Sequence, residues 1–273
     1  MTDNVRTAYE SEVLPINSFS SGKYRYYFDE GKAPSTAQVA FIIAVGTAMT
    51  CSDYATISKD IVCKSPSIVI ILDPNPGSMV KLDAKKFADN ANELTKDLAK
   101  YIPKVNTSSI KKIAIGGHSA GGQAAVESIT SGLLTFTPAA FVGLDPFEIN
   151  VKKMSIPTNA LVWGFEKTTC GVTVDMAAKA AYEISPKVSR VFYQVKNPDE
   201  KTTHCIFTDD GCFGPLCPAK QVGFWVRQAV ADSLVPFVKV LTTGSTILRD
   251  QFLAAIAAED QLKLNLYVNG EHP

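Results

Sequence analysis

Short hydrophobic runs alternate along most of the chain with longer segments in which hydrophobic residues recur every three or four positions. Most of the short runs are nearly continuous in Val, Ile, Leu, Ala and Phe, which is typical of strands covered on both faces. They predict strands over residues 24–28, 39–45, 68–72, 113–116, 140–144, 160–165 and 188–195.

The longer segments have the period of amphipathic helices. One apolar stripe runs through residues 83–102 and ends before Pro103, which cannot continue a helix. Further helices are predicted over residues 123–130, 176–184, 222–241 (with Pro236 expected to kink it) and 245–263.

This alternation of strands and helices predicts the α/β class, with a mostly parallel sheet covered by helices on both faces. The chain has 273 residues, which suits a single domain over 1–273. We expect residues 1–23 to form an N-terminal extension and residues 245–273 a C-terminal helix and tail.

The charge balance gives no support to a strongly anionic partner. Lys plus Arg and Asp plus Glu number 27 each, so nothing favours binding to nucleic acid or an anionic membrane. The longest apolar runs are too short for a transmembrane segment, and no apolar segment near the N-terminus resembles a signal peptide. The sequence is compatible with a cytoplasmic protein or an exported mature chain, and it leaves the oligomeric state open.

Six cysteines are present, at positions 51, 63, 170, 205, 212 and 217. Three of them, Cys205, Cys212 and Cys217, crowd an irregular stretch over residues 196–220, where a disulfide could stabilise a long loop. Disulfides in an exported protein and free thiols in a cytosolic one both fit this pattern.

The motif with the clearest chemistry is GHSAG at residues 117–121, which fits the pattern G-x-S-x-G. It follows a predicted strand and opens a predicted helix, which is the setting of a nucleophile elbow. Small residues at 117 and 121 let strand and helix approach closely. We therefore predict Ser119 as a nucleophile.

A nucleophilic serine needs a base, and the chain has three histidines. His118 is next to Ser119, so its side chain is expected to point away from the hydroxyl. His272 is the penultimate residue of a polar tail. By elimination the predicted base is His204, in the long loop after the last predicted strand.

Serine nucleophiles of this kind use a third residue, an acid that orients the histidine. After a nucleophile elbow this acid lies between the serine and the histidine in the sequence. Asp145 is the first candidate, because it ends a strand, where catalytic groups collect in α/β sheets. Glu166, at the end of the next strand, is the alternative acid, and Asp175 is a third choice. Asp73 precedes the serine and breaks the order.

An oxyanion hole takes one backbone N–H from the residue after the nucleophile, here Ala120. A second donor is expected from the loop after the strand over residues 39–45. Thr47, which follows Gly46 there, is the predicted donor, with Ala48 as the alternative.

With these residues assigned, the chain resembles α/β-hydrolases, in the group of chlorophyllases, cutinase-like polyester hydrolases and platelet-activating-factor acetylhydrolases. The resemblance spans residues 24–242 as an ordered series of motifs, and its chlorophyllase features are VGTAMTCSDY, GGHSAGG and GLDPFE, with a histidine in a cysteine-bearing loop and a late ILRD. One departure is Val45 before Gly46, where His or Pro is usual.

The resemblance implies a serine carboxylic ester hydrolase of the chlorophyllase-like or small-ester kind, acting on a small-molecule or lipid-like ester without a cofactor or metal. The GLDP likeness favours Asp145 as the acid, because chlorophyllases and the acetylhydrolases carry their acid at that strand end. In the polyester hydrolases the acid lies on the next strand and would fall near Thr168, which cannot serve as an acid. A lipase or phospholipase-type acyl hydrolase and a non-catalytic binding protein of the same fold are the alternatives.

Overall fold

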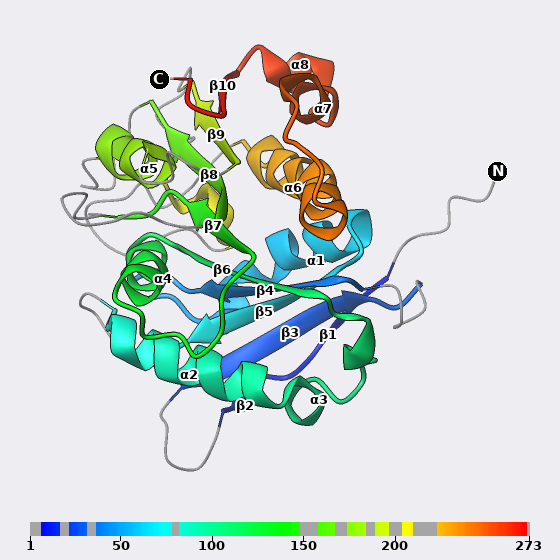
Figure 1. Cartoon of the computed structure of the whole chain (residues 1–273), viewed down its shortest axis with the longest axis vertical. Coiled ribbons are helices and arrows are strands. Elements are labelled where there is room, and N and C mark those ends of the chain that lie inside the picture. Colours follow the sequence, from blue (N-terminus) through cyan, green and yellow to red (C-terminus); the bar gives the residue numbers. More distant parts are fainter. Residues whose placement is uncertain are drawn as a thin grey trace.

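The computed structural model describes residues 7–16, 22–31, 37–77, 82–147, 158–166, 174–183, 189–196, 204–209 and 223–271. Within these ranges ten strands form one twisted sheet in the order β1-β3-β5-β4-β6-β7-β8-β9-β10, and β2 pairs with β3 (Figure 1). The strands are β1 (Ala8–Glu10), β2 (Leu14–Pro15), β3 (Lys23–Asp29), β4 (Val39–Ala44), β5 (Ser67–Asp73), β6 (Lys112–His118), β7 (Ala140–Leu144), β8 (Asn159–Phe165), β9 (Arg190–Val195) and β10 (Leu264–Val268).

The centre of the sheet, from β5 to β9, is parallel. The strands at its two edges are antiparallel: β1, β2 and β3 on one side and β10 on the other. Every residue of β4, β5 and β7 is buried, as their unbroken hydrophobic runs predict. The predicted α/β class with a mostly parallel sheet is confirmed.

Helices cover both faces of this sheet (Figure 1). On one face α1 packs against α6, and on the other α2 packs against α4, while α5 contacts β8 and β9. The helices are α1 (Ala55–Lys64), α2 (Ala84–Lys96), α3 (Leu98–Tyr101), α4 (Ala120–Thr130), α5 (Val174–Glu183), α6 (Trp225–Thr243), α7 (Arg249–Ala254) and α8 (Ala258–Gln261).

The C-terminal region differs from the sequence-based expectation. The single helix predicted over residues 245–263 is wrong, because the chain there forms two short helices, α7 and α8. After them β10 pairs antiparallel with β9, and buried residues alternate along it with partly buried ones. This two-residue period was visible in the sequence, but its five residues are too few to outweigh the preceding helical pattern.

Other differences are smaller. The predicted N-terminal extension contributes two short strands, β1 and β2, to the sheet. The helix predicted over 83–102 is broken at Asp97, whose carboxylate accepts a hydrogen bond from the N–H of Lys100 and caps α3. Helix α6 continues through Pro236. Helix α1 was not predicted from the sequence, because its apolar face is defined by packing against α6.

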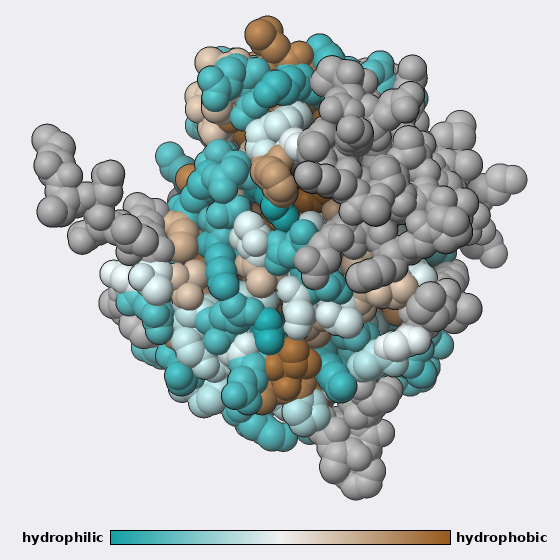
Figure 2. Space-filling model, turned by 180° about the vertical axis from the view of Figure 1, so that it is seen from behind, coloured by the Kyte–Doolittle hydropathy of each residue, from teal (hydrophilic) through white to brown (hydrophobic). Residues whose placement is uncertain are grey.

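On the face shown in Figure 2, hydrophilic residues predominate among the described ones, and hydrophobic residues form small separate spots. The exposed large hydrophobic side chains, Val13, Phe224, Val235, Leu248 and Leu262, come from separate parts of the chain. Among the helices that the structure describes, none has the length and apolar character needed to cross a bilayer.

Candidate active site

Ser119 lies on a sharp turn between β6 and α4. Its backbone has φ 54° and ψ −127°, a left-handed region that a serine adopts only under strain. The turn is held by two hydrogen bonds: the Ser119 N–H donates to the carbonyl of Leu144 (3.2 Å), and the Ser119 carbonyl accepts from the N–H of Phe147 (3.0 Å). The side chain is half-buried, so the hydroxyl is held at a site that solvent reaches.

Two glycines make this turn sterically feasible. A Cβ on Gly117 would lie 2.3 Å from the backbone carbonyl carbon of Gly121, and one on Gly121 would lie 2.2 Å from the carbonyl oxygen of Val45. Real Cβ atoms do not approach backbone atoms this closely, so strand, turn and helix pack in this way only with glycine at both positions. The structure therefore has the strand–turn–helix geometry predicted for GHSAG.

Asp145 and His204 form a buried pair beside this turn. Asp145 directly follows β7, and His204 opens a short 3₁₀ helix, η5 (His204–Phe207). The Nδ1 atom of His204 lies 2.6 Å from Oδ2 of Asp145, and both side chains are almost fully buried. Because Ser119 bonds to Leu144, the residue before Asp145, the three predicted triad residues lie together at the carboxyl ends of the central strands β6 and β7.

The backbone of Asp145 is as constrained as that of the serine. It has φ 45°, and its N–H donates to the carbonyl of Trp163 on β8 (2.7 Å). Both unusual conformations occur at the carboxyl ends of neighbouring strands, where functional groups collect in α/β sheets. Strained non-glycine residues concentrated in one place favour a functional role over a packing role.

The alternative acids lie elsewhere. Glu166 follows β8, is exposed, and makes no contact with His204 in the described part of the chain. Asp73 ends β5, which is separated from β6 by β4. Asp175 is in α5, and its side chain, like His272, lies outside what the structure describes. Of the candidate acids whose side chains the structure describes, only Asp145 lies against His204.

Burial determines the protonation of the histidine. It lowers the pKa of His204 to about 3, so the imidazole is neutral at pH 7. The carboxylate of Asp145 faces Nδ1, which assigns the proton to that nitrogen and leaves the lone pair on Nε2. In the described residues the Ser119 hydroxyl has no hydrogen bond, and such catalytic contacts commonly tighten only when substrate binds. The neutral tautomer is the one that can accept a proton.

The loop after β4 lies against Ser119. A Cβ on Gly46 would lie 3.3 Å from Cβ of Ser119, and Ala48 has φ 60°. Among the described residues no acceptor faces the N–H of Thr47 or of Ala48. Ala120 is the first residue of α4, where N–H groups have no partner within the helix. Both predicted oxyanion donors, Thr47 and Ala120, are thus near Ser119, and Ala48 is adjacent to Thr47 as the alternative.

The segment that carries His204 is fixed to two helices. Asp209 accepts a hydrogen bond from the N–H of Thr56 at the start of α1 (3.1 Å), where the helix dipole favours a carboxylate. Arg227 of α6 donates to Asp209 (3.1 Å) and to the carbonyl of Thr208 (3.1 Å). The sequence alone does not indicate these contacts of Asp209, because they join residues far apart in the chain.

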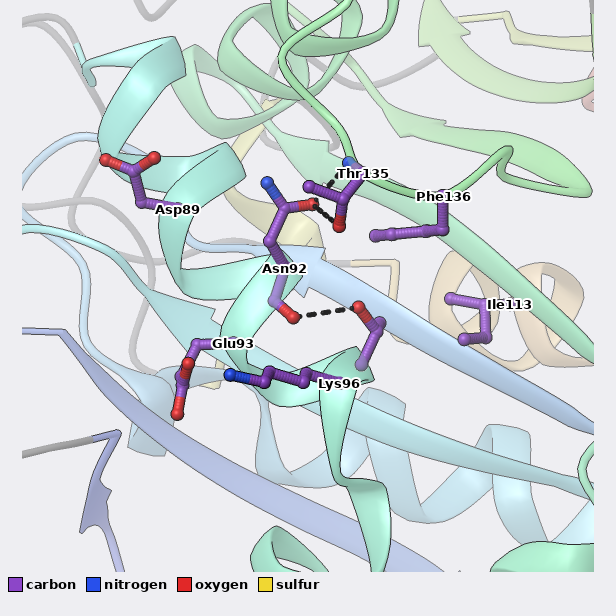
Figure 3. Close-up of a pocket in the computed structure, with 8 residues that line it drawn as sticks. Asp89, Asn92, Glu93, Lys96, Ile113, Thr135 and Phe136 are labelled. Atoms are coloured by element: carbon purple, nitrogen blue, oxygen red, sulfur yellow. Dashed lines mark hydrogen bonds between the residues drawn. The ribbon is translucent and has the colours of Figure 1, made fainter.

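A surface groove lies at the opposite end of the sheet from Ser119 (Figure 3). It is formed mainly by polar side chains of α2, including Asn92, whose side chain bonds to Thr135. Ile113, near the beginning of β6, also lines it, whereas Ser119 follows the end of that strand. This groove is therefore remote from the candidate site.

Cys51 and Cys63 carry reduced thiols and are not part of a disulfide. Burial raises the pKa of Cys51 to about 12, so this thiol is unreactive at neutral pH. Cys205 is disulfide-bonded, whereas Cys170, Cys212 and Cys217 lie outside the described residues. In the described part of the chain no group of His, Cys, Asp and Glu side chains could hold a metal ion.

Asp73, although not in the triad, provides a test of stability. Burial raises its pKa from 3.8 to about 6, so the carboxylate opposes folding above pH 6 and has no such effect below pH 3.8. We expect Asp73→Asn to stabilise the protein by about 1 kcal/mol at pH 8, a value reduced for solvent screening, and to have no effect near pH 3.5.

Denaturant unfolding at the two pH values measures this difference. The exposed Asp89, which pairs with Lys85 one turn away on α2, offers the control Asp89→Asn, expected to change stability by less than about 0.5 kcal/mol. A less stable Asp73→Asn protein at pH 8 would contradict the prediction.

No protein-family model matches the chain, and no curated protein matches it either.

Proposed function

We propose that the protein is a serine hydrolase that cleaves carboxylic esters. The observation that carries the proposal is the buried pair of Asp145 and His204, 2.6 Å apart, beside a serine in a strained strand–turn–helix backbone. Nucleophile, acid and base (Ser119, Asp145 and His204) follow one another along the chain in the order of α/β-hydrolases. The chlorophyllase-like motifs in the sequence support an ester as the substrate.

The reaction needs only groups of this chain and water. Ser119 Oγ attacks the acyl carbon while Nε2 of His204 accepts the hydroxyl proton, and Asp145 stabilises the imidazolium. The N–H groups of Ala120 and Thr47 donate to the oxyanion. His204 then protonates the leaving alcohol, and a water molecule, deprotonated by the same histidine, releases the carboxylic acid from Ser119.

Fluorophosphonate labelling followed by a p-nitrophenyl ester series from C2 to C16 tests this function. A fluorophosphonate reacts only with an activated serine, so the wild-type protein is expected to be labelled stoichiometrically. Faster hydrolysis of short chains would support a small-ester or chlorophyllase-like enzyme, and a rise towards C16 would favour a lipase. A folded wild-type protein that is neither labelled nor active would favour the non-catalytic alternative.

The acid side of the pH profile follows from the burial of His204. Since its pKa lies below the ordinary 6.5, the imidazole stays neutral and active to lower pH than an exposed histidine would. We expect kcat/KM for p-nitrophenyl acetate to reach half its maximum below pH 6.5. Recovery of activity after return to pH 7.5 controls for unfolding, and a half-maximum at or above pH 7 would contradict the expectation.

A further inference from the structure

A buried chain of hydrogen bonds connects three parts of the site through Tyr54 and His118. The N–H of Gly46 donates to the hydroxyl oxygen of Tyr54 (2.8 Å), and this hydroxyl lies 2.8 Å from Nδ1 of His118. Nε2 of His118 lies 3.0 Å from the carbonyl oxygen of His204. Tyr54 and His118 both have no exposed surface, so neither can touch a substrate.

The protons in this chain can be arranged in only one way. The carbonyl of His204 can only accept, so Nε2 of His118 carries a proton. Burial holds the pKa of His118 well below its usual value, so the ring is neutral and Nδ1 is an acceptor. Tyr54 must then donate to Nδ1 while it accepts from Gly46, and burial raises the pKa of its hydroxyl, which stays protonated. In this arrangement the N–H of Gly46, the hydroxyl of Tyr54 and both ring nitrogens of His118 each have a hydrogen-bond partner.

The segments that this chain joins are the ones that the proposed reaction uses. Gly46 precedes Thr47, a predicted oxyanion donor, and His118 precedes Ser119. The imidazole rings of His118 and His204 also pack together, with centroids 4.5 Å apart. One side chain, that of His118, therefore contacts the backbone that carries the base and, through Tyr54, the backbone of the oxyanion loop.

We propose that Tyr54 and His118 are positioning residues, which hold the oxyanion loop and His204 in register with Ser119; this inference rests on the proposed function. Without the Tyr54 hydroxyl, the buried N–H of Gly46 and the lone pair on Nδ1 of His118 lose their partners, and the loop must shift to satisfy them. Small displacements of oxyanion donors weaken transition-state binding more than substrate binding.

The test compares Tyr54→Phe with Tyr24→Phe. Tyr24 is also buried, and its hydroxyl donates to the carbonyl of Tyr101 (2.8 Å), away from the site. Each variant loses a buried hydroxyl, and both are assayed well below their own melting temperatures. We expect Tyr54→Phe to lower kcat and the rate of fluorophosphonate labelling by about tenfold or more, with KM within about twofold. Tyr24→Phe is expected to keep the wild-type kcat.

A second pair of variants tests His118 directly. Gln at this position offers an N–H for the carbonyl of His204, whereas Leu fills similar space without a donor. We expect His118→Gln to keep a kcat several times higher than that of His118→Leu. If both substitutions reduce kcat equally, while melting temperatures fall in parallel, the role of His118 is only structural and the proposal is wrong.

The outcomes separate the two proposals. Labelling of the wild type at Ser119 together with unchanged kcat in Tyr54→Phe would overturn the positioning role alone. A folded wild-type protein without labelling would overturn the ester hydrolase and, with it, any catalytic role for Tyr54 and His118. Lower kcat in both Tyr54→Phe and Tyr24→Phe would assign the effect to general destabilisation and also overturn the positioning role.

Discussion

Ser119→Ala is expected to leave the fold intact and to reduce turnover of p-nitrophenyl esters by about 10⁶-fold, the loss seen when such nucleophiles are removed. The hydroxyl makes no hydrogen bond in the described structure, so its removal should change stability by less than about 0.5 kcal/mol. Alanine keeps a Cβ, so the strained backbone of the turn gains no relief that could rearrange it. Kinetics, fluorophosphonate labelling and the melting temperature together measure these effects.

Ser131→Ala is the matched control, because Ser131 is an exposed serine at the other end of the same helix, α4. It should be labelled and active like the wild type. Retention of more than about a tenth of wild-type turnover by Ser119→Ala would exclude Ser119 as the nucleophile, because a true nucleophile acts as a unit with its base.

Asp145→Asn is expected to lower kcat by about 10⁴-fold, as the same substitution does in the Ser-His-Asp triad of serine proteases. The amide can donate its own N–H to Nδ1 of His204, which moves the imidazole proton to Nε2. In that tautomer Nε2 has no lone pair for the proton of Ser119. The size and shape of the side chain are preserved, so circular dichroism should remain that of the wild type.

Glu166→Gln tests the other acid in the same way. Because Glu166 is exposed and lies away from His204, we expect kcat within about twofold of the wild type. The opposite pattern, with Asp145→Asn active and Glu166→Gln inactive, would show that the acid lies on β8 and would overturn the assignment made here.

Local sequence signals were sufficient for the central strands and for the elbow. Buried parallel strands such as β4 and β5 appear as continuous hydrophobic runs, since both of their faces are covered. The elbow at Ser119 was predictable because the pattern G-x-S-x-G places both glycines within two residues of the serine. The steric need for Gly117 arises within the turn, from the backbone of Gly121, whereas the need for Gly121 arises from the carbonyl oxygen of Val45, which only the structure shows.

The edges of the sheet depended on contacts that the sequence shows only weakly. Strands β1 and β10 are short, and they are stabilised by backbone pairing with β3 and β9 rather than by hydrophobic runs of their own. Helix α1 was missed for a related reason, because its apolar face is defined by packing against α6.

The sequence by itself determined the α/β class, the position of Ser119 and a short set of partners for it, because each depends on residue type and on neighbours within a few positions. Only the tertiary structure chose between Asp145 and Glu166 as the partner of His204, and only it revealed that Tyr54, His118 and Gly46 share one hydrogen-bonded chain. These are contacts between residues far apart in sequence, and their geometry exists only after the sheet has brought the ends of its strands together.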